Sequence, residues 1–320
     1  MSEPSRTPRW LAWALACGTF PLIWMGGLVT TYGAGMAVPD WPNTFGYNLF
    51  LYPLESWIRV FDVFLEHSHR LIASAVGMIT LALAWALWRC EPRAWLRWLG
   101  LVAVVAVIAQ GVLGGVRVLG QEVFLAKLHG CTAPVFFSLT TAMVAFLSVP
   151  WQAEQPAAAP VGRLRGFAWT VTVLVYIQIV LGANVRHLPP TNPPVWFQLY
   201  VWLHLIVVGL LLIGIVTLAA LVGRRVKASP GNGRIVVRRA RWLLVLFFIQ
   251  GTLGLFTWLV RYGVPNWFAT YVYPLDYTVA AGSLLQATVV TAHVAVGSLT
   301  LVAAQSLALW LGRLDRGAAA

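Results

Sequence analysis

Long apolar runs alternate with short polar segments along almost the whole chain. A helix that crosses a bilayer needs about 20 predominantly apolar residues, because each residue rises about 1.5 Å and the hydrocarbon core is about 30 Å thick. Eight runs reach this length, at about residues 10–31, 65–88, 96–116, 127–149, 167–186, 199–222, 242–261 and 284–311. The pattern predicts an all-α integral membrane protein with eight transmembrane helices.

A short motif recurs in three of these predicted helices. Q-x-x-L-G begins at Gln110, Gln178 and Gln250, and a degenerate copy surrounds Gly26. Each copy is followed by a polar segment and then by a run with a histidine near its start. Parallel structural repeats are common in membrane proteins. We therefore expect two pseudo-symmetric four-helix bundles, residues 1–150 and 167–320, joined by a cytoplasmic linker at 151–166.

Composition supports the membrane assignment and excludes other classes. Apolar residues make up 59% of the 320 residues and charged residues only 10%, whereas a soluble domain averages about 25% charged. The net charge of +12 does not indicate a nucleic-acid partner, because the basic residues are spread over short segments between apolar runs. Cys17, Cys90 and Cys131 form no C-x-x-C motif, so neither a disulfide nor a cysteine metal site is expected.

The basic residues also predict the orientation. Sixteen of the 22 lie at the two termini or in the segments after the second, fourth and sixth runs. Because lysine and arginine favour the cytoplasmic side of a membrane, we expect both termini in the cytoplasm and the protein in the cytoplasmic membrane.

Four histidines lie at one matched depth, each near the start of an even-numbered run. Each precedes the polar residue that closes its run by 20 or 21 residues, so each imidazole lies about 30 Å from the far end of its helix. A histidine inside a membrane is costly and needs a partner. The layer therefore predicts axial ligands of haem iron, two in each bundle. The expected pairs are His69 with His129 and His204 with His293. Histidines that are hydrogen-bonded to backbone or water remain the alternative.

The segment Glu66-His67-Ser68-His69-Arg70 carries further chemistry. Glu66 and His69 are three residues apart and share one helical face, which places a carboxylate beside the expected iron. Arg70 is a candidate partner for a haem propionate, because a guanidinium matches a carboxylate in geometry. A Glu66–Arg70 pair that braces the helix mouth is the alternative interpretation.

These features together resemble the haem A synthase family. The resemblance rests on eight predicted spans in two halves, on Glu66-x-x-His69-Arg70, and on Gly26-Gly27-Leu28-Val29-Thr30 before Gly35-Met36-Ala37-Val38-Pro39-Asp40-Trp41-Pro42. The family usually has an arginine after the threonine, where this chain has Thr31. The resemblance covers almost the whole chain.

The resemblance implies an oxidoreductase of haem biosynthesis. It would oxidise a methyl group of haem O to the formyl group of haem A by two hydroxylations, with oxygen from water. His69 and His129 would hold the substrate haem and Glu66 would be the catalytic carboxylate, while His204 and His293 would ligate haem b. Expected partners are haem O, membrane lipid, an electron acceptor and a haem O synthase or oxidase assembly partner. A dihaem electron-transfer cytochrome and a non-catalytic haem-handling assembly protein stay open as alternatives.

Overall fold

The prediction of eight apolar helices is confirmed. The computed structural model describes residues 6–120, 122–153, 161–189, 191–226, 233–273 and 279–318, and that part of the chain contains helices and no strand. Eight of its helices are long and apolar enough to cross a membrane. They are α1 (Thr7–Thr31), α3 (Phe61–Cys90), α4 (Ala94–Gly120), α5 (Val123–Phe146), α7 (Gly162–Arg186), α8 (Pro194–Arg225), α9 (Gly233–Tyr262) and α11 (Leu284–Ala318).

Four short helices complete the described structure. They are η1 (Ala34–Met36), α2 (Leu54–Arg59), α6 (Val149–Gln152) and α10 (Asn266–Tyr271). Within the expected linker at 151–166, α6 ends at Gln152 and α7 begins at Gly162; residues 154–160 lie outside the described residues.

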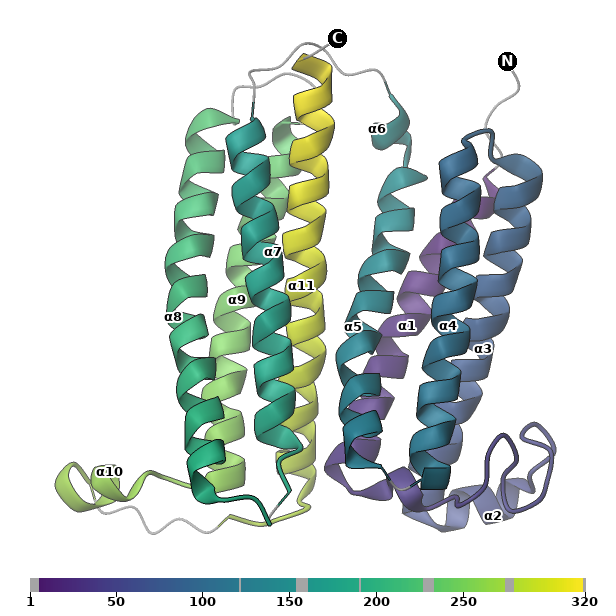
Figure 1. Ribbon diagram of the computed structural model, residues 1–320, viewed down its shortest axis with the longest axis vertical. Coiled ribbons are helices and arrows are strands. Elements are labelled where there is room, and N and C mark those ends of the chain that lie inside the picture. The colour runs from purple at the N-terminus through teal and green to yellow at the C-terminus, as the bar shows by residue number, and fades with distance from the viewer. Residues whose placement is uncertain are drawn as a thin grey trace.

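Two groups of long helices stand side by side (Figure 1). Helices α1, α3, α4 and α5 pack against one another, and so do α7, α8, α9 and α11. Each group has its own buried core. The first core includes Leu15, Leu83, Leu87 and Met143, and the second includes Ile215, Leu218, Leu243 and Leu307. Large apolar side chains also point outward, for example Trp85 and Ile213, each 67% exposed, as expected of helices that face lipid.

The two groups meet along α1, α5, α7 and α11, a contact region that we call the seam. A Cβ atom on Gly27 would lie only 2.8 Å from Cγ2 of Thr291, so glycine is what lets α1 and α11 approach so closely. The hydroxyl oxygens of Thr31 and Thr291 are 3.4 Å apart.

Both termini lie at the same end of the bundle (Figure 1). We call the opposite end, which holds the segments after α1, α4, α7 and α9, the histidine end. The segment after α1 packs on its own half, since η1 contacts α1 and α3, and α2 contacts α3. In contrast, α10 projects sideways, and the Tyr271 that ends it is 84% exposed.

Candidate functional site

The structure places the four predicted ligands at corresponding positions. They lie on α3, α5, α8 and α11, each within the first eleven residues of its helix, and all four side chains are half-buried. The matched depth inferred from residue spacing therefore reflects a real layer at the histidine end. The four histidines are His69, His129, His204 and His293.

A glycine of the preceding spanning helix backs every one of these imidazoles. A Cβ atom built on that glycine would lie 3.0–3.3 Å from the Cε1 atom of the histidine ring. Such a distance is tighter than an ordinary carbon contact, so a larger residue would displace the ring. The four contacts are Gly26–His69, Gly114–His129, Gly182–His204 and Gly254–His293. The glycine in each copy of the sequence repeat is thus in close contact with a histidine ring, which it leaves room for.

The histidines come together in the expected pairs. The rings of His69 and His129 have centroids 6.4 Å apart and are inclined at 85°. His204 is close enough to His293 to act on it electrostatically. Among the described residues no group of three or more metal-binding side chains is present, so the histidines form pairs rather than a mononuclear metal cluster.

The ring nitrogens are oriented alike in all four residues. Nδ1 of each histidine is buried without a full hydrogen bond, and Nε2 is not enclosed in this way. The backbone of the preceding spanning helix nevertheless interacts with each ring, at Leu22, Gln110, Gln178 and Gln250 in turn. The Oε1 atoms of Gln110, Gln178 and Gln250, one turn before the repeat glycines, are also buried and unpartnered. Paired imidazoles that turn Nε2 outward from the backing helix fit the axial positions of a haem iron.

The carboxylate of Glu66 is buried and fully engaged. Its side chain belongs to a residue that is only 2% exposed. Oε1 accepts a hydrogen bond from Arg70 Nη2 at 2.7 Å, and Oε2 accepts one from the backbone N–H of Val38 at 2.9 Å. Glu66 therefore ties the helix of His69 to the segment after α1.

Arg70 also makes several contacts with this segment. Nη1 donates to the carbonyl oxygens of Asp40 and Asn43 at 2.7 and 2.9 Å, and Nη2 donates to that of Val38 at 2.9 Å as well as to Glu66. A propionate could reach these nitrogen atoms only by replacing an existing bond. The structure thus shows the bracing pair, and binding of a propionate by Arg70 stays a prediction.

Asp40 and His67 hold the same segment from its two sides. Asp40 accepts hydrogen bonds from the backbone N–H groups of Phe45 and Gly46, both at 2.8 Å. Burial acts to raise the pKa of Asp40, but these bonds outweigh it and hold the pKa below the usual 3.8. His67 is 1% exposed, and its Nδ1 lies 3.0 Å from Thr44 Oγ1. It is a satisfied buried histidine and not a member of the layer formed by His69, His129, His204 and His293.

The sequence did not single out a set of basic residues at the histidine end. Arg117, Lys127 and Arg186 are half-buried there, and each donates a hydrogen bond to a neutral oxygen. In the sequence an arginine at the end of an apolar run looks like an ordinary interface residue. Only the packing of distant helices shows what surrounds it.

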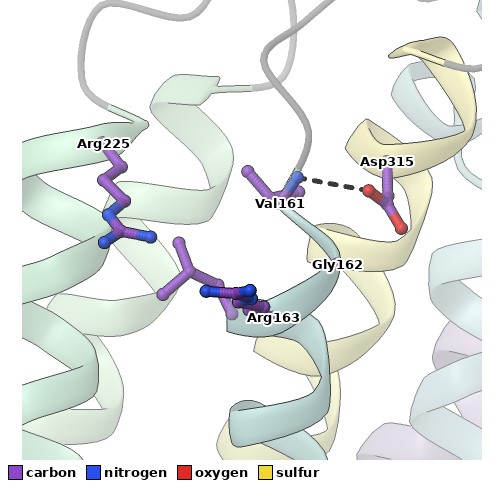
Figure 2. Close-up of a pocket in the computed structure, with 6 residues that line it drawn as sticks. Val161, Gly162, Arg163, Arg225 and Asp315 are labelled. Carbon is purple, nitrogen blue, oxygen red and sulfur yellow. Dashed lines mark hydrogen bonds between the residues drawn. The ribbon is translucent and has the colours of Figure 1, made fainter.

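A cavity of about 360 Å³ lies at the other end of the molecule. It is lined by the start of α7, the end of α8 and Asp315 of α11 (Figure 2). Asp315 accepts a hydrogen bond from the backbone N–H of Val161 at 3.2 Å. Arg225 and His204 lie 21 residues apart on one helix, which is roughly 30 Å. This cavity is therefore remote from the histidine layer.

Comparison with known proteins agrees with the geometry. The profile of the COX15-CtaA family, described as cytochrome oxidase assembly protein, matches residues 9–190. Heme A synthase from Shouchella clausii is 32% identical over 176 residues, which cover 53% of this chain and 56% of that protein. Heme A synthase from Exiguobacterium sp. is 26% identical over 270 residues, 80% of this chain and 82% of that protein.

Several of the other alignments are partial too. Heme A synthase from Sphingopyxis alaskensis is 27% identical over 220 residues, 58% of this chain and 60% of that protein. In the Shouchella and Sphingopyxis alignments the chain thus spans little more than half the length of its relative. The family profile, however, covers more than half of the chain and includes α1 to α5 with His69 and His129. The chain is a multi-pass membrane protein of the COX15-CtaA family of cytochrome oxidase assembly proteins.

Proposed function

We propose that this protein is a haem A synthase, which oxidises a methyl group of haem O to the formyl group of haem A with oxygen derived from water. The observation that carries the proposal is the set of four glycine-backed histidines, arranged as two pairs at one depth. The curated relatives are themselves called heme A synthase.

Each half would hold one haem. His69 and His129 would hold the substrate haem O in residues 1–150, and His204 and His293 would ligate haem b in residues 167–320. A bound haem iron supplies the redox chemistry. Conversion of a methyl to a formyl group consumes one water and releases four electrons and four protons. An electron acceptor and a route for protons are therefore both required.

Glu66 is the residue proposed to handle protons. It lies one turn before His69 on the same helical face. One carboxylate oxygen is bonded to Arg70 and the other to Val38, so the carboxylate is held in a fixed position beside the histidine pair. A carboxylate so placed can accept a proton from an attacking water after it gives up one of these bonds.

A dihaem electron-transfer cytochrome is the second candidate. It is favoured by the full engagement of Glu66, because electron transfer between two haems needs no free carboxylate. In that function Glu66 and Arg70 would only brace the segment after α1.

One experiment separates the two functions. The full chain is expressed in a host that supplies haem O, and the haems are extracted and identified by mass. Haem A or its hydroxylated intermediate is expected from the unaltered chain. Haem O and haem b recovered without any oxidised product would contradict the enzyme and favour the cytochrome.

Variants in each half test which haem is held where. His293→Ala should remove the stable low-spin haem b, because one axial ligand is lost, while His129→Ala should mainly lower the content of the exchangeable haem. His67→Ala is the control, because this histidine is buried outside the histidine layer. Haem content is measured on purified protein from the reduced absorption spectrum. A normal low-spin spectrum in His293→Ala would show that the pairing is wrong.

A further inference from the structure

Several positive charges gather at the histidine end without carboxylate partners. The ion pairs among the described residues use Arg59, Arg70, Arg93 and Arg165. None of them uses Arg117, Lys127 or Arg186, although all three are half-buried. A cation withdrawn from water is costly unless an anion or hydrogen-bond acceptors compensate it. The histidine end therefore carries positive charge that hydrogen-bond acceptors stabilise but that no ion pair of the described residues neutralises.

Arg186 lies in the seam, where it joins α7 to α1. From the end of α7 its Nη2 atom donates to the carbonyl oxygen of Gly27 at 3.0 Å and to Thr31 Oγ1 at 2.7 Å, both on α1. Gly27 follows the glycine that backs His69. Thr31 in turn contacts Thr291, which is two residues before His293. The guanidinium is thus close enough to His293 to act on it electrostatically, and it is bonded to the residue next to the glycine that backs His69.

Arg117 has a comparable place in the N-terminal half. Its Nη2 atom donates to the carbonyl oxygen of Gly35 at 3.2 Å. A Cβ atom on Gly35 would lie 2.5 Å from that nitrogen, so the guanidinium lies directly against the glycine backbone. Arg117 is close enough to His69 and His129 to act on both electrostatically.

Both arginines have N–H groups that make no hydrogen bond to the described residues. Only Nη2 of each is bonded to the described residues, and Nε and Nη1 are not among the enclosed, unpartnered atoms. The donors are therefore accessible to a ligand. A planar guanidinium with a free edge binds a carboxylate through two parallel hydrogen bonds.

We propose that Arg117 and Arg186 bind the propionate carboxylates of the haems held by the two histidine pairs, and that Arg186, which joins α7 to α1, couples the two sites. This inference rests on the haem binding of the proposed function. Arg70, the residue singled out from the sequence for this role, already has its terminal nitrogens engaged.

The test compares haem b with its dimethyl ester, in which both propionates are uncharged. Each is titrated into the purified full-length chain from a haem-depleted host, for the unaltered protein and for Arg117→Gln and Arg186→Gln. Loss of a hydrogen bond to a charged group should weaken haem b binding about 10- to 100-fold. The ester should bind the unaltered and substituted proteins equally. Arg59→Gln is the control, because Arg59 lies at the same end but its side chain is 74% exposed.

Redox titration of the haem-loaded proteins gives a second readout. Loss of a nearby positive charge disfavours the reduced haem, so midpoint potentials should fall. Arg117→Gln should lower the potential of the haem at His69 and His129, whereas Arg186→Gln should lower both. If the two arginines had only a structural role, their substitution would not lower the midpoint potentials in this pattern.

Each contrary outcome is distinct. An equal loss of affinity for haem b and its ester would mean that Arg186 only fastens α7 to α1, and the inference would be wrong. Unchanged haem binding, with less phospholipid copurifying with Arg186→Gln, would assign the charge to a lipid phosphate and also overturn it. An unaltered chain that binds neither haem would refute the proposed function itself.

Discussion

Glu66 belongs to one of two i, i+4 ion pairs near the histidine end that differ sharply in burial. Glu66 and Arg70 are 2.7 Å apart with side chains 3% and 10% exposed, while Glu55 and Arg59 are 3.5 Å apart and largely exposed. An exposed pair contributes little to stability, whereas loss of one partner of a buried pair typically costs about 3–5 kcal/mol. The contrast supplies a matched control for the catalytic hypothesis.

Glu66→Gln should lower stability, because Arg70 loses its charged partner, but the folded protein should retain both haems and stop at haem O. The amide keeps the shape of the carboxylate but cannot take a proton, and loss of a positioned base typically lowers a rate by about 10²–10⁴-fold. Glu66→Asp should keep part of the activity, because only reach is lost. Haem content and haem A yield are measured together, with Glu55→Gln as the control. If haem content and haem A yield fell in parallel, Glu66 would stabilise the structure and would not act as a catalytic base.

His187 provides a prediction about pH. It follows α7 directly and is half-buried. Burial, and after it the positive charges of Arg186, Lys127, Arg117 and Arg261, lower its pKa to about 4. Between pH 6.5 and about 4 the unfolded chain therefore binds a proton that the folded chain does not, so stability should fall as the pH falls through this window.

The measurement is the thermal midpoint of haem release as a function of pH. His187→Gln should flatten the loss between pH 6.5 and 4, because the titrating group is gone. An unchanged slope in this variant would assign the pH dependence to groups other than His187.

At the scale of helices, the repeat glycines give the sharpest prediction. Gly254 and Gly251 lie on the same helix, but only Gly254 backs a histidine; a Cβ on Gly251 would meet nothing within 4 Å. Gly254→Ala should push the ring of His293 and lower the low-spin haem content, whereas Gly251→Ala should be neutral or raise stability by roughly 0.5–1 kcal/mol through helix propensity. Equal spectra for the two variants would contradict the inference that Gly254 positions the ring of His293.

The long helices show which structural features the hydropathy of the sequence predicts and which it does not. Every predicted run became a helix, because an apolar run of spanning length has few alternatives in a membrane. The ends were less well predicted. Helix α9 begins at Gly233, nine residues before the predicted start at 242, because Arg234 and its basic neighbours are polar yet form helix readily. Hydropathy therefore identifies the apolar part of a helix but not the polar residues that extend it.

The short helices and the bracing contacts lay beyond sequence analysis for a different reason. Helices of six residues, such as α2 and α10, are too short to show a periodic pattern. The histidine layer was predictable because depth follows from residue counts along single helices. The position of Arg186 could not be predicted in this way, because its hydrogen bond to Thr31 joins residues 155 positions apart in the chain.

At the scale of the whole molecule, the distribution of basic residues predicts that both termini are cytoplasmic. The structure puts the termini together at the end opposite the histidines (Figure 1), and from the charge asymmetry we expect this end to face the cytoplasm. A reporter fused to the C-terminus should be active only if it functions in the cytoplasm. The matched fusion carries the reporter at Asn192, in the short segment between α7 and α8, and should show the reverse. Activity on the same side in both would disprove the assignment.

The depth of the histidine layer has an electrical consequence. A charge that crosses the whole bilayer gains or loses about 2.3 kcal/mol per 100 mV of membrane potential. The histidines lie within a few turns of one end and about 20 residues from the other. Electrons withdrawn toward the near face would thus cross little of the voltage, while electrons drawn to the far face would cross most of it. The response of turnover to an imposed potential in vesicles would therefore reveal from which face the acceptor draws its electrons.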